Sequence, residues 1–477
     1  MPRVSKREIP DRKYRCYTFG KNSWRRQKVN REKCGVIGIY AFDENWNVSR
    51  FIYYGLVALQ NRGQETCGMA VFDGKNMKVI KGKGLAENFF TQNSLDEAKG
   101  WAGIGHVSPL NPQFDENIQP VYVNDDVKVA LGYNGKVLNY KELVEGKFKS
   151  EEDAVAVASL LAKELKHSDP LEAMESAMEK MRGAYSLVAF TDKGEMIVAR
   201  DPKGVKPLVI GSFGFDHGAI ASESAAIDVI GADLKADIKP GEIYVINQYT
   251  IERKSAFRDK ERYCAFEYVY LCRPDSIING KSVYEARMKI GEYLAEEFPV
   301  DADIVIGVPE TAIPFAMAYS NATGIPIHMG FVRSGRGMRT AIRPTQFERL
   351  VGVQLKLNPI RQAIRGKRVV LIDDSVVRGT TTRNIVNMMR NRIGAKEVHV
   401  RIGSSRLISP CPFGVEVPEK DELIAAHLTE EEVSKVVGAD TFAWLSLEGM
   451  IKAIGLPKDK LCMGCFTGEY PYLEEGI

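Results

Sequence analysis

Long hydrophobic runs are absent from this sequence of 477 residues. No apolar stretch approaches the roughly 18 residues that cross a bilayer, so we expect no membrane-spanning segment and no membrane partner. The first 33 residues also lack the apolar core of about 7–15 residues that a secretory signal requires. Cysteine is scarce, with eight residues. This excludes a disulfide scaffold and predicts a reducing cytoplasm, where cysteines are more often catalytic or metal-bound than cross-linked.

The composition is otherwise ordinary, with 44% hydrophobic and 27% charged residues. These fractions are typical of globular proteins and exclude a largely disordered or collagen-like chain. The length predicts two or three domains.

The net charge of +3 hides an asymmetry between the N-terminal segment and the rest. Residues 1–33 hold twelve Lys or Arg and three acids, which gives +9, whereas the remainder holds 53 bases and 59 acids, which gives −6. A basic segment of this kind is typical of a nucleic-acid arm. A removable leader is the other interpretation, and we expect no nucleic-acid partner.

The pattern of predicted strands and helices changes near residue 255, which divides the chain after residue 33 into two parts. From residue 34 to about 248, short β-like runs with glycine turns are interrupted by two helical stretches, 153–166 and 171–182, which predicts sheets sandwiched by helices. From about 281 to 452, strands alternate with helices, which predicts a parallel sheet covered on both faces. We therefore expect domains over 34–255 and 256–455, followed by a cysteine-containing tail over 456–477.

The most specific motif is the string VVLIDDSVVRGTT at 369–381. A buried strand ends in Asp373 and Asp374, at the edge where open α/β sheets bind ligands. The small and hydroxylated residues that follow open a helix and suit a phosphate. Two acids beside a phosphate site fit a phosphorylated sugar with Mg²⁺. Two acids alone would more often be a solvated turn.

Two further segments support a polyphosphate site. The string VPETA at 308–312 follows a predicted strand and could present backbone amides to a pyrophosphate, although a strand followed by a Pro turn is usually only a turn. The Gly-rich, basic segment 333–349 includes Arg339 and Arg343. Such a loop can close over a polyanion and exclude water; the alternative is a solvated surface loop.

Cys34 directly precedes a β-like run in the string KCGVIGIY at 33–40. A thiolate that attacks an amide carbon needs a nearby base. If Cys34 becomes the first residue, its own α-amine can serve as that base, and residues 1–33 become a leader. The string YNGKVLN at 133–139 could form an oxyanion hole from the Asn134 side chain and the Gly135 amide. A buried structural cysteine and a plain hairpin turn are the commoner alternatives.

Together with QNRGQE at 60–65, these strings resemble the class II glutamine amidotransferases, which have the N-terminal-nucleophile hydrolase fold. The string at 369–381 resembles the phosphoribosyl pyrophosphate (PRPP) signature of type I phosphoribosyltransferases. The whole chain from residue 34 to about 471 resembles one family, the glutamine phosphoribosylpyrophosphate amidotransferases. The implied fold is an αββα sandwich followed by a parallel-sheet domain, and the implied reaction makes 5-phosphoribosylamine, glutamate and pyrophosphate in purine synthesis.

The resemblance also implies roles for individual residues. Asp373 and Asp374 would hold the ribose hydroxyls and, with Thr311, the Mg²⁺ ion. Other contacts to PRPP would come from the turn at 375–381 and the two supporting segments, namely Glu310, Thr311, Arg339, Arg343, Ser375, Arg378, Gly379, Thr380 and Thr381. Four cysteines match the ligands of a [4Fe–4S] cluster that some family members carry, namely Cys264, Cys411, Cys462 and Cys465. A homotetramer inhibited by purine nucleotides is also implied.

The glutaminase half departs from the family pattern in two strings, and the family's His-Asn-Gly-Asn reads Tyr133-Asn134-Gly135-Lys136 here. Ser108 stands where the family has an Arg that grips the glutamine α-carboxylate. Asp153, or equally Glu152, would hold the glutamine amine, and Arg62 or Lys136 could replace the missing Arg. This departure motivates one alternative, an ammonia-dependent phosphoribosyltransferase with an impaired glutaminase half. A non-catalytic sensor of PRPP or nucleotides is the other.

Overall fold

The architecture described here is that of a computed structural model, which describes residues 34–109, 115–143, 153–214, 216–257, 259–333 and 357–473. The basic segment 1–33, Glu152, Arg339 and Arg343 lie outside these ranges.

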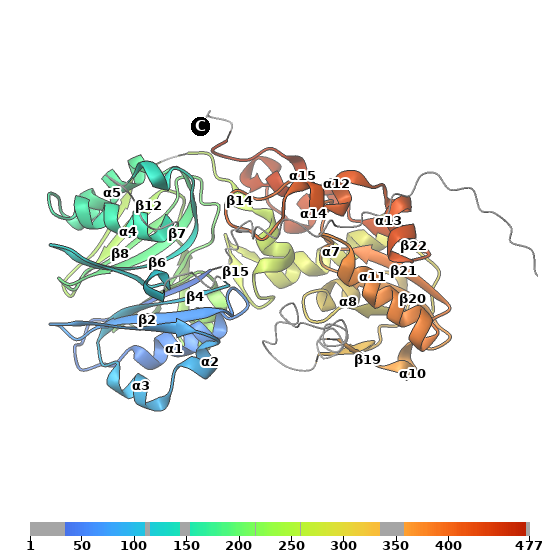
Figure 1. Ribbon diagram of the computed structural model, residues 1–477, viewed down its shortest axis with the longest axis horizontal. Coiled ribbons are helices and arrows are strands. Elements are labelled where there is room, and N and C mark those ends of the chain that lie inside the picture. Colours follow the sequence, from blue (N-terminus) through green and yellow to red (C-terminus); the bar gives the residue numbers. More distant parts are fainter. Residues whose placement is uncertain are drawn as a thin grey trace, which may run out of the picture. The chain divides into compact units, whose positions relative to one another are not determined.

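The first large sheet has seven antiparallel strands in the order β11-β9-β10-β1-β4-β2-β3 (Figure 1). All seven residues of β1, β2 and β4 are buried, as expected for central strands covered on both faces. The strands are β1 Gly35–Ala41, β2 Thr66–Phe72, β3 Met77–Lys83, β4 Ala102–Ser108, β9 Val209–Phe213, β10 His217–Ala221 and β11 Asp233–Asp237.

The second sheet has six antiparallel strands in the order β13-β12-β8-β7-β6-β5. Its inner face packs on the first sheet, since Val188 and Phe190 belong to the same buried cluster as Ile37 and Ile39. The Tyr40 hydroxyl also crosses between the sheets and donates to the Gly194 carbonyl at 2.9 Å. The strands are β5 Val121–Asn124, β6 Lys128–Val137, β7 Gly183–Thr191, β8 Met196–Arg200, β12 Glu242–Ile246 and β13 Ile251–Ser255.

Helices cover the outer faces of this pair of sheets (Figure 1). Helix α1, Ser49–Ala58, packs on the first sheet through Ile52 and Leu56. Helices α4, Asp153–Glu164, and α5, Pro170–Lys180, pack on the second through Leu161 and Met178. The helical stretches predicted at 153–166 and 171–182 are therefore present, and the layers run helix, sheet, sheet, helix.

The C-terminal half contains a four-stranded parallel sheet in the order β17-β20-β21-β22. Its strands are β17 Ile304–Gly307, β20 Arg368–Asp373, β21 Glu397–Ile402 and β22 Thr441–Trp444. The helices between and beside them are α7 Val283–Glu297, α8 Ile313–Thr323, α11 Thr380–Asn387, α13 Glu430–Val437 and α14 Leu447–Ile454. This is the predicted alternation of strand and helix.

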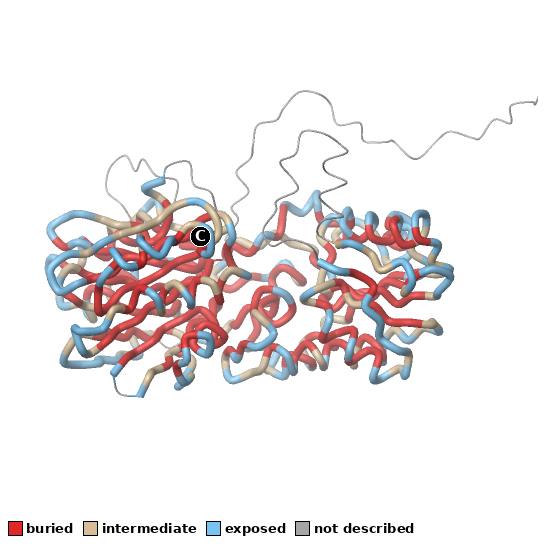
Figure 2. Tube along the Cα trace, turned by 90° about the horizontal axis from the view of Figure 1, so that it is seen from below, coloured by how far each residue is buried: buried red, intermediate tan, exposed pale blue. Residues whose placement is uncertain are grey.

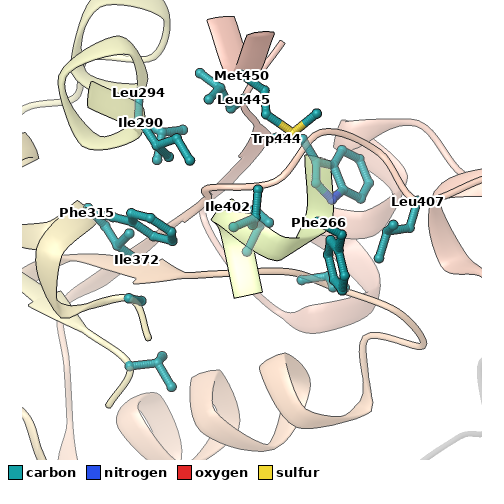
Figure 3. Close-up of a cluster of buried hydrophobic side chains, with 14 of the residues drawn as sticks. Phe266, Ile290, Leu294, Phe315, Ile372, Ile402, Leu407, Trp444, Leu445 and Met450 are labelled. Atoms are coloured by element: carbon teal, nitrogen blue, oxygen red, sulfur yellow. The ribbon is translucent and has the colours of Figure 1, made fainter. Parts of the chain in front are cut away.

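Side chains of the parallel sheet and of the helices packed on it form its core (Figure 3). Ile372 and Ile402 come from the strands, while Ile290, Phe315 and Met450 come from α7, α8 and α14. Figure 2 shows buried chain running through the centre of the described residues, with exposure concentrated on turns and outer helix faces. The carboxyl ends of β17, β20 and β21 lie on one edge of this sheet, because the strands are parallel.

Short elements complete the described chain. Strand β14, Tyr263–Cys264, pairs in parallel with β23, Leu461–Cys462, and so attaches the C-terminal segment to the start of the second half. Further short elements are α2 Ala86–Phe89, α3 Gln92–Glu97, α6 Ser224–Val229, β15 Ile277–Ile278, β16 Lys281–Ser282, β18 Phe331–Val332, β19 Asn358–Pro359, α10 Arg361–Ile364, α12 Ile424–His427, α15 Gly464–Thr467, two π-helical turns, Glu267–Leu271 and Met388–Ile393, and four 3₁₀ turns, Asp115–Asn117, Tyr140–Glu142, Lys420–Glu422 and Lys458–Lys460.

Candidate active sites

Cys34 lies at the entrance to the central strand β1 and is 2% exposed. Strand β1 pairs antiparallel with β4, with Gly35 opposite Val107, so Cys34 comes beside the last residue of β4. The Cys34 thiol lies 3.6 Å from the Ser108 hydroxyl. Cys34 is therefore a thiol held between two strands at the end of the inner face of the first sheet.

Asn134 comes to the same end of the sandwich from β6. A Cβ atom on Gly132 would lie 3.3 Å from a Val36 methyl, so this position of β6 faces the start of β1. At the other end of β1, Tyr40 faces Phe190, the cross-strand partner of Ala130, with ring centroids 6.3 Å apart. Residue numbers therefore rise along β6 as they fall along β1, which brings Asn134 level with Cys34.

The Asn134 side chain is buried and has a hydrogen-bond donor without a partner. It is 1% exposed, and among the described residues its Nδ2 atom has no hydrogen-bond partner. A buried donor without a partner is costly, and such groups are typical of sites that complete their bonding with a ligand. Gly135 follows at φ 143°, where a Cβ would collide with the Ala184 carbonyl, so only glycine fits this position. The Asn134 side chain thus comes level with the thiol and is followed directly by Gly135, and their role as oxyanion donors stays a prediction.

His106 of β4 forms a hydrogen bond between the two sheets, next to Asn134. Its Nε2 atom lies 3.0 Å from the Tyr133 carbonyl, directly before Asn134, and the side chain is fully buried. Burial lowers the pKa of His106 to about 4, so the ring is neutral at physiological pH. The sequence motif alone did not reveal this contact, which links β4 to the segment that carries Asn134.

A buried ion pair lies one step further along β6. The Lys136 ammonium is 3.3 Å from Asp153, whose other carboxylate oxygen accepts hydrogen bonds from the Tyr133 hydroxyl at 2.6 Å and the Val137 amide at 2.9 Å. Asp153 is 2% exposed and begins α4. The structure therefore brings Asp153 to the strand that carries Asn134 and Gly135, next to a lysine of the same strand.

Arg62 lies in a different network. Its guanidinium donates to Glu223, and to Glu267 at 2.7 Å, and contacts the Cys272 sulfur at 3.1 Å. All of these side chains are buried. The two carboxylates raise the pKa of Arg62 further above its usual range against the opposing effect of burial. With its nitrogens occupied in this way, Arg62 is better suited to join the first half of the chain to the second than to bind substrate.

The sequence motifs missed this network because its members are far apart in the chain. Glu223 also accepts hydrogen bonds from the Arg273 amide at 2.7 Å and the Ser276 hydroxyl at 2.7 Å. Its members come from residues 62, 223, 267, 273 and 276, and nothing in the sequence shows that these positions meet. The prediction that Arg62 binds glutamine stays untested, but these contacts favour a structural role.

The second candidate site lies at the carboxyl end of β20. Asp373 is buried, and burial together with the neighbouring Asp374 raises its pKa well above the usual range. Asp373 accepts the Asp374 amide at 2.9 Å, and Asp374 accepts the Ser375 hydroxyl at 2.7 Å. The residues after β21 lie beside Asp374, since the Ser404 amide donates to the Asp374 carbonyl at 2.8 Å. The pair of carboxyls thus sits at the sheet edge where the sequence predicted it.

The turn after these acids leads directly into α11. Gly379 adopts a left-handed conformation at φ 71° just before the helix begins at Thr380, so the amides of Thr380 and Thr381 belong to the first turn. Arg378 is exposed and pairs with Glu422 at 2.5 Å. Amides at the start of a helix suit an anion. The segment Ser375–Thr381 therefore has the form expected of a phosphate-binding turn.

The loop 308–312 lies next to this turn. The Val308 amide donates to the Ile372 carbonyl at 2.8 Å, which ties the end of β17 to the end of β20. Glu310 is exposed and lies 3.9 Å from Arg333, while Thr311 is half-buried. The loop is therefore placed beside Asp373 and Asp374. Arg339 and Arg343 lie outside the described residues, so their predicted contacts stay predictions.

Four cysteines gather at the junction of β14 and β23. Cys264 and Cys462 are paired in the register of these strands, and the Cys465 carbonyl accepts the amides of Ile408 and Ser409, two residues before Cys411. None of the four is in a disulfide. Burial raises the pKa of Cys264 to about 12, with Glu267 and Cys411 contributing in the same direction. Within the described ranges, no three His, Cys, Asp or Glu side chains form a group that could hold a metal ion as they stand.

Comparison with known proteins decides which family this is. The amidophosphoribosyltransferase of Methanocaldococcus jannaschii is 44% identical over 466 residues, covering 92% of this chain and 97% of its own. That of Bacillus subtilis is 39% identical over 455 residues, covering 92% and 94%. This chain belongs to the amidophosphoribosyltransferase family.

Structures and domains of the family agree with this membership. A solved glutamine PRPP amidotransferase from B. subtilis, complexed with ADP and GMP, superposes with a TM-score of 0.84 at 38% identity, covering 92% of this chain and 97% of its own. A second solved structure, described as the allosteric regulatory enzyme of purine biosynthesis, gives a TM-score of 0.85 at 38% identity, covering 92% and 96%. Residues 109–229 match the glutamine amidotransferase domain family.

These findings confirm the predicted family and the predicted fold class, an αββα sandwich followed by a parallel-sheet phosphoribosyltransferase half. The domain boundaries at 34–255, 256–455 and 456–477 stay predictions, as do the roles of individual site residues. No helix in the described part of the chain combines the length and apolarity needed to cross a bilayer.

Proposed function

We propose that this chain is a glutamine-dependent amidophosphoribosyltransferase, which makes 5-phosphoribosylamine, glutamate and pyrophosphate from PRPP, glutamine and water. This would be the first step of purine biosynthesis, the process named for its solved relative. The observation that carries the proposal is the presence of both sites in one chain. Cys34 stands level with the unpartnered Asn134 donor in one half, and Asp373 and Asp374 end a strand beside a phosphate-binding turn in the other.

In the glutaminase half, the Cys34 thiolate attacks the side-chain amide carbon of glutamine. Asn134 Nδ2 and the Gly135 amide would donate hydrogen bonds to the carbonyl oxygen as negative charge develops on it, and because the Asn134 donor is already buried without a partner, little reorganisation is needed. Ammonia leaves, and water then hydrolyses the thioester to glutamate. Asp153, together with Arg62 or Lys136, would contact the amino-acid end of the substrate.

The base for this step would be the α-amine of Cys34 itself, after removal of residues 1–33. Such an amine has an unperturbed pKa near about 8 and needs no histidine. Intact mass and N-terminal sequencing of the mature protein test this directly. A mature chain that keeps residues 1–33 and is fully active with glutamine would contradict it.

In the phosphoribosyltransferase half, Asp373 and Asp374 would bind the ribose hydroxyls, while the turn Ser375–Thr381 would receive the 5′-phosphate. Glu310, Thr311, Arg339 and Arg343 would contact the pyrophosphate side of PRPP. Ammonia attacks the anomeric carbon as pyrophosphate departs, and exclusion of water protects the oxocarbenium-like centre.

The donor set at this edge fits a divalent cation. Asp373 and Asp374 offer carboxylate oxygens, and the adjacent loop 308–312 offers the Thr311 hydroxyl, all oxygen ligands of the kind that Mg²⁺ prefers. When bound, Mg²⁺ would neutralise charge on the leaving pyrophosphate.

The four cysteines fit a [4Fe–4S] cluster by their chemistry. Cys264, Cys411, Cys462 and Cys465 are free cysteines at the junction of β14, β23 and the segment before Cys411, and four thiolates satisfy a cubane. Such a cluster would tie the C-terminal segment to the start of the second half. No open ligand would remain for chemistry, so the role would be structural.

Other properties of the family are proposed by analogy. The B. subtilis relative was solved with ADP and GMP, and we propose that purine nucleotides inhibit this chain as well. A homotetramer and a cytoplasmic location are proposed on the same basis.

Ser108, in place of the family arginine, favours a second candidate function, an ammonia-dependent phosphoribosyltransferase. Pyrophosphate release from PRPP, measured with glutamine and with ammonium, separates the two. We expect release with both donors, and loss of both in Asp373→Asn, because the buried carboxyl acts on PRPP. Release with ammonium alone would favour the second candidate.

A further inference from the structure

Strand β6 carries Asn134 beyond the end of one of its two neighbouring strands. On one side β6 pairs with β7, and Asn134 lies opposite Ser186. On the other side β5 covers β6 only as far as Leu131, which lies opposite Val121. Two residues further along the same register, Gln119 would stand opposite Tyr133, the residue directly before Asn134.

Two side chains bind the backbone of Tyr133 where the pairing with β5 has ended. Gln119 Oε1 accepts the Tyr133 amide at 2.8 Å, and His106 Nε2 donates to the Tyr133 carbonyl at 3.0 Å. Both side chains are buried. Buried backbone groups without partners are costly, so these two bonds do for Tyr133 what a neighbouring strand does elsewhere in a sheet.

Gln119 is itself held by a row of residues across the first sheet. His106 of β4, Gly68 of β2 and Lys81 of β3 are cross-strand partners and so share one face of the sheet. A Cβ atom on Gly68 would lie 2.6 Å from the Gln119 carbonyl oxygen, so glycine leaves room for the chain at this point. The Lys81 ammonium donates, within 3.2 Å, to three carbonyls around Gln119, those of Glu116, Ile118 and Pro120.

The proposed oxyanion donor depends on this backbone for its position. Asn134 Nδ2 has no hydrogen-bond partner among the described residues, so none of them fixes this atom directly. An oxyanion donor must lie about 2.7–3.1 Å from the developing charge, and a misplacement of about 1 Å can cost about 100-fold in rate. The peptide groups on either side of Tyr133 are the part of β6 that Gln119 and His106 hold.

We propose that Gln119 is a positioning residue for glutamine hydrolysis, which sets the Asn134 donor through its hydrogen bond to the Tyr133 amide. The inference rests on the proposed glutaminase function and deepens it by naming a residue that acts on the transition state without touching the substrate.

Steady-state glutamine hydrolysis by the mature enzyme, measured with PRPP present, tests the proposal. Gln119→Met keeps the length of the side chain but removes the acceptor. We expect kcat to fall about 10-fold with KM within about 2-fold, because the donor is displaced in the transition state rather than removed. Gln119→Glu keeps an acceptor oxygen and should retain most of the wild-type rate. Gln92→Met, at an exposed glutamine of α3, is the matched control and should change nothing.

A double-mutant cycle with Asn134→Ala separates positioning from packing. Once the Asn134 donor is gone, Gln119→Met has nothing left to displace, so we expect it to change kcat by less than about 2-fold in that background. The same loss in both backgrounds would overturn the proposal in favour of a packing role. An unchanged kcat in both Gln119→Met and a second neutral variant, Gln119→Leu, would overturn it as well.

Product formation from PRPP and ammonium distinguishes this inference from the function on which it rests. We expect it to be unchanged in every Gln119 variant, and its loss together with glutamine hydrolysis would show a general effect on the fold and overturn the inference. A wild-type enzyme that makes product with ammonium and hydrolyses no glutamine would overturn the glutaminase function as well, whereas normal wild-type glutamine use with no effect of Gln119→Met would overturn this inference alone.

Discussion

At the scale of single residues, Asn134 and Gly135 beside Cys34 adopt costly arrangements in the absence of substrate. Asn134 keeps a buried donor without a partner, and Gly135 occupies backbone space that no other residue fits. A protein accepts these costs where the ligand completes the bonding.

Replacing Asn134 by Ala removes one oxyanion donor. We expect kcat for glutamine hydrolysis to fall about 100- to 1,000-fold, with a small change in KM, because the contact forms in the transition state. Product formation from PRPP and ammonium is the internal control and should be unchanged. A variant that loses both activities would show that Asn134 acts on the fold instead.

His106 predicts a pH dependence of stability. Its pKa of about 4 in the folded state lies below the 6.5 of an unperturbed histidine, because burial disfavours the charged ring. The unfolded chain therefore binds more protons between these values, and stability is lost as pH falls from about 6.5 toward 4. Between pH 7 and 5, His106 should account for about 2 kcal/mol of this loss. Urea unfolding of wild type and His106→Gln at both pH values measures the difference; parallel losses would contradict the assignment.

At the scale of elements, two short strands fasten the C-terminal segment. The parallel pairing of β14 with β23 aligns Cys264 with Cys462, and the Tyr470 hydroxyl donates to the Pro410 carbonyl at 2.5 Å, one residue before Cys411. These contacts bring three distant parts of the chain together.

Cys462→Ser tests whether a cluster reinforces this junction. We expect protein purified without oxygen to lose its bound iron and sulfide and the visible absorbance of the wild type, with faster proteolysis of the segment after residue 456. Cys67→Ser, a buried cysteine in β2 far from the junction in sequence, is the control and should keep its iron. Wild-type protein without iron or sulfide would contradict the cluster.

Hydrophobic periodicity in the sequence predicted the longer helices and strands, but not the pairing of β14 with β23. The helices at 153–166 and 171–182 follow from apolar periodicity, and the strand at 369–372 from its β-branched run, because these signals are local. Strands of two residues such as β14 and β23 carry no periodic signal. Their pairing depends on contacts nearly 200 residues apart.

At the scale of the whole molecule, a buried ionic network joins the two halves. Arg62 precedes β2 in the first half, while Glu267 begins a π-helical turn in the second, and their side chains meet at 2.7 Å. The pKa of Glu267 is lowered by Arg62, which outweighs the effect of burial.

Glu267→Gln leaves a buried guanidinium with one carboxylate fewer. We expect the free energy of unfolding to fall by about 3 kcal/mol, because breaking one partner of a buried pair exposes its uncompensated charge. Glu431→Gln breaks an exposed pair with Lys435 and should cost less than about 1 kcal/mol. Urea unfolding compares the two; equal effects would contradict a stabilising role for the network.

The sequence predicted the residues within each site motif, but not the contacts between residues far apart in the chain. The motifs containing Cys34, Asn134 and Asp373 are contiguous, so their chemistry can be read from neighbouring residues. The environment of Arg62 could not be predicted from the sequence, because its carboxylate partners lie 161 and 205 residues away along the chain. For the same reason, the sequence offered Arg62 and Lys136 as equal substitutes, whereas the contacts of the two side chains separate them.

The transfer of nitrogen from glutamine through Cys34 is the central claim, and isotope tracing measures it most directly. Mature protein is supplied with PRPP and glutamine labelled with ¹⁵N in the side-chain amide, and the ¹⁵N content of the phosphoribosylamine is determined by mass spectrometry after trapping. The account predicts labelled product from the wild type and none from Cys34→Ala, which still makes product from ammonium. Labelled product from Cys34→Ala, or unlabelled product from the wild type, would contradict it.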